Sequence, residues 1–307
     1  MASVATSNTE TKTSQKSSWS TARDLPKISA LIAVIGVIWV TLWQLHPSLL
    51  FSNTLVTGGD TGAHVALAAY LEHTLLPSGH LTGWYPGWYD GYPIYTYYFV
   101  LPDLLAALGA HVLGFDIAFK LATVLGALIL PICAYAMGRL FGLKGALPSA
   151  LAVATLPFLF DGSFTIDGGN LFSTMAGEYS FSFSLSIALL LIGLVARGVR
   201  TGKGTLLTPL VAMVCLAAHF VPYLYAIVLG LTVALMALIP QHWRGDDTLD
   251  TPEGLLRDPN EISRRKVVRW CVRVALLAAT LSAWWVLPFA TSQLYACLLY
   301  TSDAADE

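Results

Sequence analysis

Nearly all lysine and arginine residues of this chain lie in four patches that alternate with long apolar and acidic stretches. Sixteen of the 17 lie in four patches, at residues 12–27, 139–144, 197–203 and 244–273. Residues 46–116 and 161–180 contain acids but no lysine or arginine. Basic loops of a polytopic membrane protein stay in the cytoplasm. The alternation therefore predicts a membrane protein whose acidic loops form the outer surface, where its functional site is expected.

The composition also indicates a membrane protein. Hydrophobic residues make up 55% of the chain and charged residues 12%, with a mean hydropathy of +0.63, which is too apolar for an ordinary soluble domain. The segregated charge gives no support to nucleic-acid binding. Residues 1–27 predict a disordered cytoplasmic tail. Residues 28–45 then form an apolar run without a cleavage site and predict an uncleaved first helix.

Eight apolar segments are candidate transmembrane helices, but eight crossings would violate the charge rule. The segments are residues 28–45, 95–113, 118–140, 146–160, 181–196, 206–220, 221–239 and 271–289. Eight crossings would place the basic loops at 197–203 and 244–269 outside. We expect residues 95–113 to be the segment that fails to cross, because they contain Asp103 and an intramembrane aspartate is costly. The alternative is the proline-containing segment 146–160.

The predicted fold is an all-α, polytopic transmembrane helical bundle in the cytoplasmic membrane, with the N-terminus cytoplasmic. About seven spanning helices are expected in a domain covering residues 28–289. Its expected loops are outer loops 46–117 and 161–180 and cytoplasmic loop 241–270. Residues 61–76 are too polar to span and predict an interfacial helix. Residues 290–307 form a tail in which 297–307 resemble a translated sequencing adapter, so we expect an N-terminal fragment of a longer protein.

Acids that converge on the outer side are the predicted catalytic residues. Asp60, in the sequence Gly58-Gly59-Asp60-Thr61, suits either a helix cap or a general base or metal ligand. Glu178 lies where an outer loop re-enters the bilayer, and a carboxylate at that depth is costly unless it has a partner or a role. Asp60 and Glu178 are therefore the two residues expected to carry chemistry.

The predicted substrate-binding residues come from the same outer loops. They are His64, Trp84, Trp88, Asp90, Tyr92, Asp161, Asp167 and His219. His64 follows Asp60 by one helical turn and suits either a second ligand or a solvent-facing position. The aromatic cluster suits either an anchoring belt or the binding of a sugar ring or isoprenoid. No residues have a spacing that predicts a dedicated metal site.

The order of these motifs resembles a family of bacterial membrane proteins described as 6-pyruvoyl-tetrahydropterin-synthase-related. The resemblance covers most of residues 28–289. It rests on Gly59-Asp60-Thr61 with His64, Gly91-Tyr92-Pro93 followed by residues 97–102, Ala176-Gly177-Glu178, His219, and Trp285 with Pro288 and Phe289. The family name does not imply pterin chemistry. These proteins look like GT-C glycosyltransferases, in which acids of the outer loops, here Asp60 with Asp161, Asp167 or Glu178, act on a lipid-linked sugar.

The resemblance implies transfer of a sugar from a polyprenyl-phosphate donor to an envelope acceptor at the outer face. The expected partners are membrane lipid and that donor, and the cofactor is unknown, with a divalent metal as the open candidate. One alternative is a transporter or lipid flippase, which would use intramembrane polar residues and usually shows repeated halves. The other is a non-catalytic membrane protein of envelope assembly.

Overall fold

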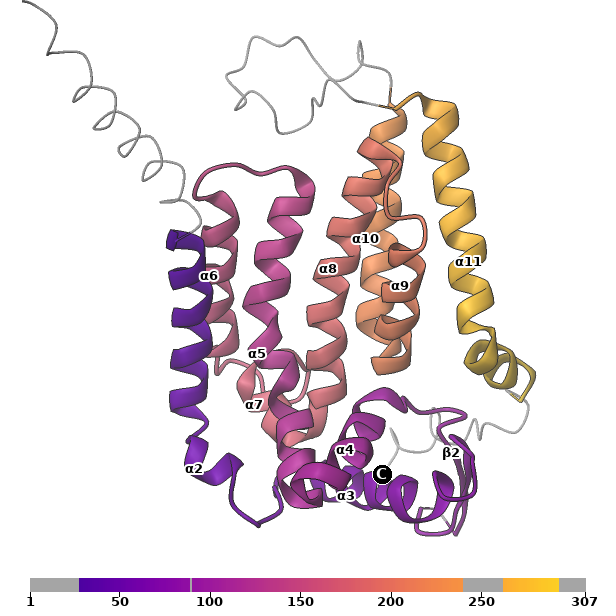
Figure 1. The fold of residues 1–307 in the computed structure, drawn as a ribbon. Coiled ribbons are helices and arrows are strands. Elements are labelled where there is room, and N and C mark those ends of the chain that lie inside the picture. The colour runs from indigo at the N-terminus through magenta and orange to yellow at the C-terminus, as the bar shows by residue number, and fades with distance from the viewer. Residues whose placement is uncertain (1–27, 89, 240–261, 293–307) are drawn as a thin grey trace, which may run out of the picture.

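The protein is a helical bundle whose lower end in Figure 1 is covered by a layer of short elements. The structure is a computed structural model that describes residues 28–88, 90–239 and 262–292. The upright helices are Ile28–Gln44, α5 (Phe115–Phe141), α6 (Leu147–Leu159), α8 (Tyr179–Thr201), α9 (Leu207–Ala218), α10 (Phe220–Leu238) and α11 (Arg264–Thr291). The expectation of a helical protein with apolar helices is confirmed.

By length and composition, four described stretches could each cross a membrane. They are Phe115–Phe141, Leu171–Thr201, Phe220–Leu238 and Arg264–Thr291. The α6 and α9 helices, which the sequence also predicts to cross, have 13 and 12 residues. They therefore reach only about 20 and 18 Å, against roughly 30 Å for the hydrocarbon core. The prediction of seven crossings consequently remains a prediction.

Close contact between α5 and α8 forms the centre of the bundle. A Cβ atom on Gly126 would come within 2.4 Å of the backbone nitrogen of Phe183, and one on Gly193 within 2.8 Å of the Cα atom of Met137. Ser186 of α8 donates a hydrogen bond to the carbonyl of Gly126 at 2.8 Å. Small residues that let backbones approach are typical of helix pairs in membranes. This contact fixes the position of the residues that precede α8.

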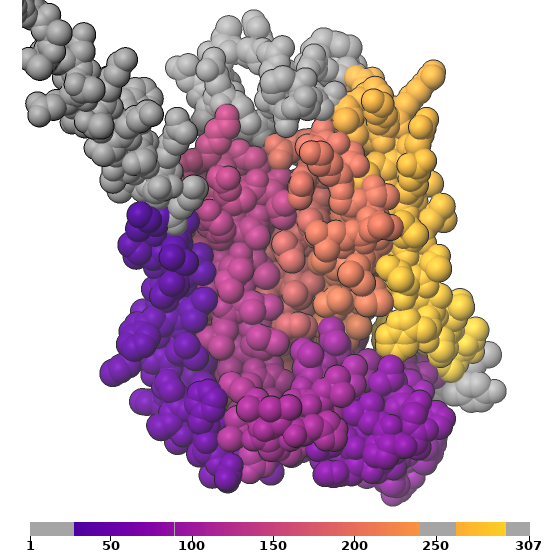
Figure 2. Space-filling view, viewed as in Figure 1, coloured from indigo at the N-terminus to yellow at the C-terminus, as the bar shows by residue number. Residues whose placement is uncertain are grey.

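The layer at the lower end is built from residues between the first helix and α5. Its elements are α2 (Pro47–Leu50), α3 (Thr61–Tyr70), the π-helical turn η1 (Leu71–Leu75), β1 (Gly83–Tyr85), β2 (Tyr92–Ile94) and α4 (Leu101–Leu113). In the space-filling view these residues form a continuous purple floor beneath the upright helices (Figure 2). The α4 helix lies in this floor (Figure 1), as expected for the segment that was predicted not to cross.

The structure adds two details to the predicted fold. Residues 83–94 contain a short two-stranded antiparallel sheet, with Tyr85 opposite Tyr92, in a described chain that is otherwise helical, as predicted. The apolar run that predicted the last helix begins at residue 271, but α11 begins at Arg264 because its arginine-rich first turns are also helical. The predictions for the N-terminal tail, most of the loop at 241–270 and the C-terminal tail fall on residues 1–27, 240–261 and 293–307, outside the described residues.

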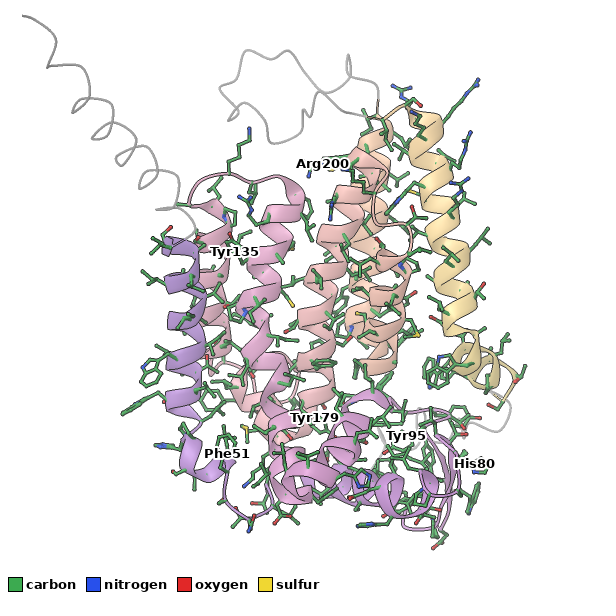
Figure 3. All side chains as sticks on the ribbon, viewed as in Figure 1. Phe51, His80, Tyr95, Tyr135, Tyr179 and Arg200 are labelled. Atoms are coloured by element: carbon green, nitrogen blue, oxygen red, sulfur yellow. The ribbon has the colours of Figure 1, made fainter. Side chains whose placement is uncertain are left out.

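The two ends of the bundle differ in the residues they carry. Arg200 lies near the upper end, whereas Tyr95 and Tyr179 lie near the floor (Figure 3). Between α7 (Leu171–Ser173) and α8, the turn η2 (Thr174–Glu178) also reaches the floor. The outer loops predicted from the distribution of charge thus meet at one end of the bundle.

Candidate functional site

The two predicted outer loops cross backbone to backbone at glycine-rich turns. The amide of Asp60 donates a hydrogen bond to the carbonyl of Ala176 at 2.8 Å. A Cβ atom on Gly59 would lie 2.0 Å from the same carbonyl oxygen, and Gly177 has a φ of +123° where it packs against Asp60. A side chain at either glycine would disturb this crossing. The crossing therefore brings Asp60 close to Glu178, which directly follows Gly177.

Burial, followed by the negative charge of Asp60, raises the pKa of the Glu178 carboxyl above its ordinary value. Asp60 is exposed and Glu178 is half-buried. Asp60 occupies the N-cap position of α3, but its side chain makes no capping hydrogen bond, so the structural role as a helix cap is not realised. Asp167 adds a further negative charge that acts on Glu178. Neighbouring carboxylates can share a proton and are a common arrangement for acid–base chemistry.

His64 lies beside this pair and is buried, which excludes the solvent-facing alternative. Its Nε2 atom is 3.2 Å from the hydroxyl of Tyr98, and its buried Nδ1 atom has no hydrogen-bond partner. Burial lowers the pKa of His64 to about 4, while the negative charge of Asp60 acts in the opposite direction. The imidazole is therefore neutral at physiological pH and holds Tyr98 next to the acidic pair.

A buried carboxylate that the sequence-based site did not include lies behind these residues. Asp103 of α4 accepts a hydrogen bond from Tyr95 at 2.8 Å and another from Tyr179, one to each carboxylate oxygen. This arrangement joins α4 and the segment after β2 to the start of α8. The sequence contained one signal of it, since an aspartate in an apolar segment is costly unless it has partners. The tyrosine partners could not be identified from spacing.

The predicted aromatic binding cluster divides into packed and exposed members. Trp88 packs against Tyr85, Tyr92 and Tyr98, with ring centroids 5.8 to 6.4 Å apart. Trp84 is 62% exposed and its ring lies over Gly91, where a Cβ atom would come within 2.3 Å. Through Tyr98 the cluster is continuous with His64. It is thus a folded aromatic wall beside the carboxylates.

The other predicted binding residues have mainly structural contacts. Asp90 lies in the turn between the strands, with a φ of +60°. Asp161 accepts a hydrogen bond from the amide of Ser163 at 2.9 Å, which lowers the pKa of this exposed carboxyl and forms a local turn. His219 accepts a hydrogen bond from the amide of Val221 at 3.2 Å, and its ring contacts Phe99 at a tilt of 37°, with the centroids 4.2 Å apart. Of the acids of the second outer loop, Glu178 is therefore the best-placed partner for Asp60.

The described residues do not provide a dedicated metal site. They contain no group of three or more His, Cys, Asp or Glu side chains that could hold a metal ion. The basic residue nearest in sequence to the floor is Lys120 of α5, and it is buried. Its ammonium donates to the carbonyls of Leu49 and Ser52 at 2.6 and 2.5 Å. Through these hydrogen bonds Lys120 fastens residues 49–52, at the end of α2, to the α5 helix.

Comparisons with family models, with curated proteins and with solved structures found no match to this chain. The family resemblance drawn from the motifs therefore stays a prediction. The functional argument rests on the geometry of the site.

Proposed function

We propose that this protein is a GT-C-like glycosyltransferase of the cytoplasmic membrane. It would transfer a sugar from a polyprenyl-phosphate donor to an envelope acceptor at the outer face. The observation that supports this most directly is the backbone hydrogen bond from Asp60 to Ala176, which brings the segments of Asp60 and Glu178 together. Tyr179, which follows Glu178, lies near the end of the molecule remote from Arg200 (Figure 3). By the positive-inside rule, the end with the basic loops faces the cytoplasm and the acidic pair faces out.

In the proposed reaction the acceptor hydroxyl oxygen attacks the anomeric carbon of the donor sugar. The new carbon–oxygen bond forms as the bond to the phosphate oxygen breaks, and the lipid phosphate leaves with the bonding electron pair. Asp60 accepts the hydroxyl proton because its carboxylate is exposed and makes no capping hydrogen bond. Glu178 accepts a hydrogen bond from the same acceptor and orients it.

The aromatic wall supports a sugar or isoprenoid ligand next to these acids. Trp88 and Tyr98 have ring centroids 6.0 Å apart, and Tyr98 contacts His64. Flat aromatic faces beside carboxylates are a common combination in carbohydrate sites. No step is assigned to a metal, because the described residues offer no three-ligand group. The described part of the chain likewise assigns no side chain to the leaving phosphate, since Lys120 is held by main-chain carbonyls.

The geometry argues against transport through Asp103. A transport pathway that used this acid would need it to face a passage through the bundle. Instead, Asp103 is buried in the floor and both of its oxygens are occupied by tyrosine hydroxyls. The glycosyltransferase is therefore preferred over the transporter.

The test uses a strain of the source organism that lacks the gene. The strain is complemented with wild type, Asp60→Asn, Glu178→Gln or the matched control Asp116→Asn, and its envelope glycans and lipid-linked sugars are profiled. We expect wild type and Asp116→Asn to restore a missing glycan. Asp60→Asn and Glu178→Gln should leave the lipid-linked donor to accumulate at equal protein abundance. Full complementation by both carboxamide variants would exclude catalysis by this pair.

A further inference from the structure

The first half of α11 carries a stripe of arginines. Arg265, Arg269 and Arg273 recur every four residues and so share one helix face. Arg264, Val268 and Val272 lie beside them, and the six residues line a shallow surface recess of about 650 Å³. Nitrogen-tipped side chains project outward from the upper part of α11 (Figure 3). The recess is therefore both basic and open.

The opposite face of α11 is fixed against the bundle, which determines where the arginines point. Trp270 is only 5% exposed, and its indole nitrogen donates to the carbonyl of Lys203 at 3.1 Å. Its ring fills the space above Gly198 so closely that a Cβ atom there would lie within 1.9 Å. Val267, one turn earlier, is also buried. The packing of Trp270 and Val267 fixes the rotation of α11 about its axis, so the arginine stripe lies on the exposed face.

The length of α11 places the stripe at the level of lipid headgroups. The helix has 28 residues and is about 42 Å long. The lower end of α11 bends away from the upright part (Figure 1), and Pro288 lies inside the helix. Residues 274–287, between the last arginine and this proline, extend about 21 Å, which covers most of a hydrocarbon core of roughly 30 Å. If these residues lie in the core, Arg264, Arg265, Arg269 and Arg273 lie in the polar region of the same leaflet. None of the four makes an ion pair with any residue in the described part of the chain.

We propose that the Arg265–Arg269–Arg273 stripe binds the phosphate of an anionic phospholipid. Arginine suits this ligand because its planar guanidinium donates two hydrogen bonds to one phosphate. Val272 and Leu276, which are 52% and 64% exposed, continue the same surface toward the core and contact the acyl chains. Basic recesses at helix ends commonly recognise acidic lipid headgroups. The inference is independent of the proposed function, because it involves the opposite end of the bundle.

The test measures lipid bound to the purified 307-residue protein. Wild type is incubated with mixed micelles of phosphatidylglycerol and phosphatidylcholine in equal amounts, and retained lipid is identified by mass spectrometry. We expect phosphatidylglycerol to be enriched. The triple variant Arg265→Gln, Arg269→Gln, Arg273→Gln should reduce that enrichment roughly tenfold or more. Its lysine counterpart should retain most of it. The matched control Arg139→Gln, Lys144→Gln, Lys203→Gln removes the same charge elsewhere and should leave the enrichment unchanged.

Three outcomes would overturn the proposal. One is equal retention of phosphatidylglycerol by wild type and the glutamine triple variant when both elute as single species with the same helicity. Another is an equal loss in the control triple variant, which would indicate a general charge effect. The third is displacement of the lipid by millimolar inorganic phosphate, which would indicate a site for free phosphate.

Discussion

Gly59 lies directly against the carbonyl oxygen of Ala176, at a distance where a Cβ atom would be only 2.0 Å away. The next residue, Asp60, donates its amide to the same oxygen at 2.8 Å. One carbonyl thus joins the floor to the segment that leads into α8. Because the contact is between backbones, it places the Asp60 and Glu178 carboxylates together without depending on either side chain.

Gly59→Ala should break this crossing. The substitution forces an alanine into a φ of +46° and into contact with the Ala176 carbonyl, so we expect a loss of about 2–5 kcal/mol of unfolding free energy. Gly62→Ala is the matched control, because nothing lies within 4 Å of a Cβ atom at that helical position. Thermal unfolding of the two detergent-solubilised variants measures the difference. Equal stability of both variants would contradict the observed contact.

Asp103→Asn should change how stability depends on pH. Burial raises the pKa of Asp103 from 3.8 to about 7, although the hydroxyls of Tyr179 and Tyr95 act in the opposite direction. The folded state therefore favours the protonated carboxyl. The resulting stabilisation is present below pH 3.8 and is lost as the pH rises through about 7. We expect the stability of wild type relative to Asp103→Asn to fall by about 4 kcal/mol between pH 4 and pH 8.

The comparison with the variant is needed because His64 has the opposite effect. Burial lowers the pKa of His64 to about 4. Its contribution to stability is present above pH 6.5 and is lost as the pH falls through about 4. Chemical unfolding of wild type and Asp103→Asn across this range separates the two effects. A difference that stays constant with pH would show that Asp103 does not titrate in this way.

Tyr98→Phe should destabilise the floor by leaving both ring nitrogens of His64 without a partner. The cost of an unpaired buried polar group is about 1–3 kcal/mol. Tyr70→Phe is the control, because it removes an exposed hydrogen bond to the Trp84 carbonyl and should cost less than about 1 kcal/mol. Denaturant unfolding gives both values. The prediction fails if Tyr70→Phe proves the more damaging of the two.

Lys120→Met should loosen the chain around α2. The variant keeps most of the apolar side chain but removes the ammonium that donates to the carbonyls of Leu49 and Ser52, so we expect residues 46–57 to become sensitive to protease. Lys144→Met, at an exposed position near the opposite end, is the control and should leave the cleavage pattern unchanged. Mass spectrometry of limited digests identifies the cut sites. Identical patterns for the two variants would exclude a fastening role.

Much of the architecture could be predicted from the apolar segments and the spacing of basic patches. The apolar helices and the meeting of the two acidic loops at one end of the molecule follow from that pattern, whereas the non-spanning character of residues 95–113 stays a prediction. Helix lengths could not be predicted reliably. The α6 and α9 helices have only 13 and 12 residues, and α11 begins at Arg264, seven residues before its apolar run.

The site was less predictable because its partners are distant in sequence. His64 was identified by its spacing from Asp60, but its burial depends on Tyr98 and Tyr179, whose rings lie 5.4 and 5.2 Å away. Trp285, one of the residues that carry the family resemblance, is buried, and its indole nitrogen donates to the carbonyls of Tyr95 and Tyr98. These contacts connect α11 to the floor, and no local pattern encodes them.

The sequence by itself determined that this chain is a membrane-type helical protein with acidic and basic ends, because hydropathy and charge act on each segment separately. The tertiary structure alone decided which acid accompanies Asp60 and which side chains are buried with His64 and Asp103. Those choices depend on contacts between distant segments. Thr61 and Met175 are 114 positions apart in the sequence, and Asp103 and Tyr179 are 76 positions apart. Such contacts are specified by packing at glycines and by the pairing of buried polar groups.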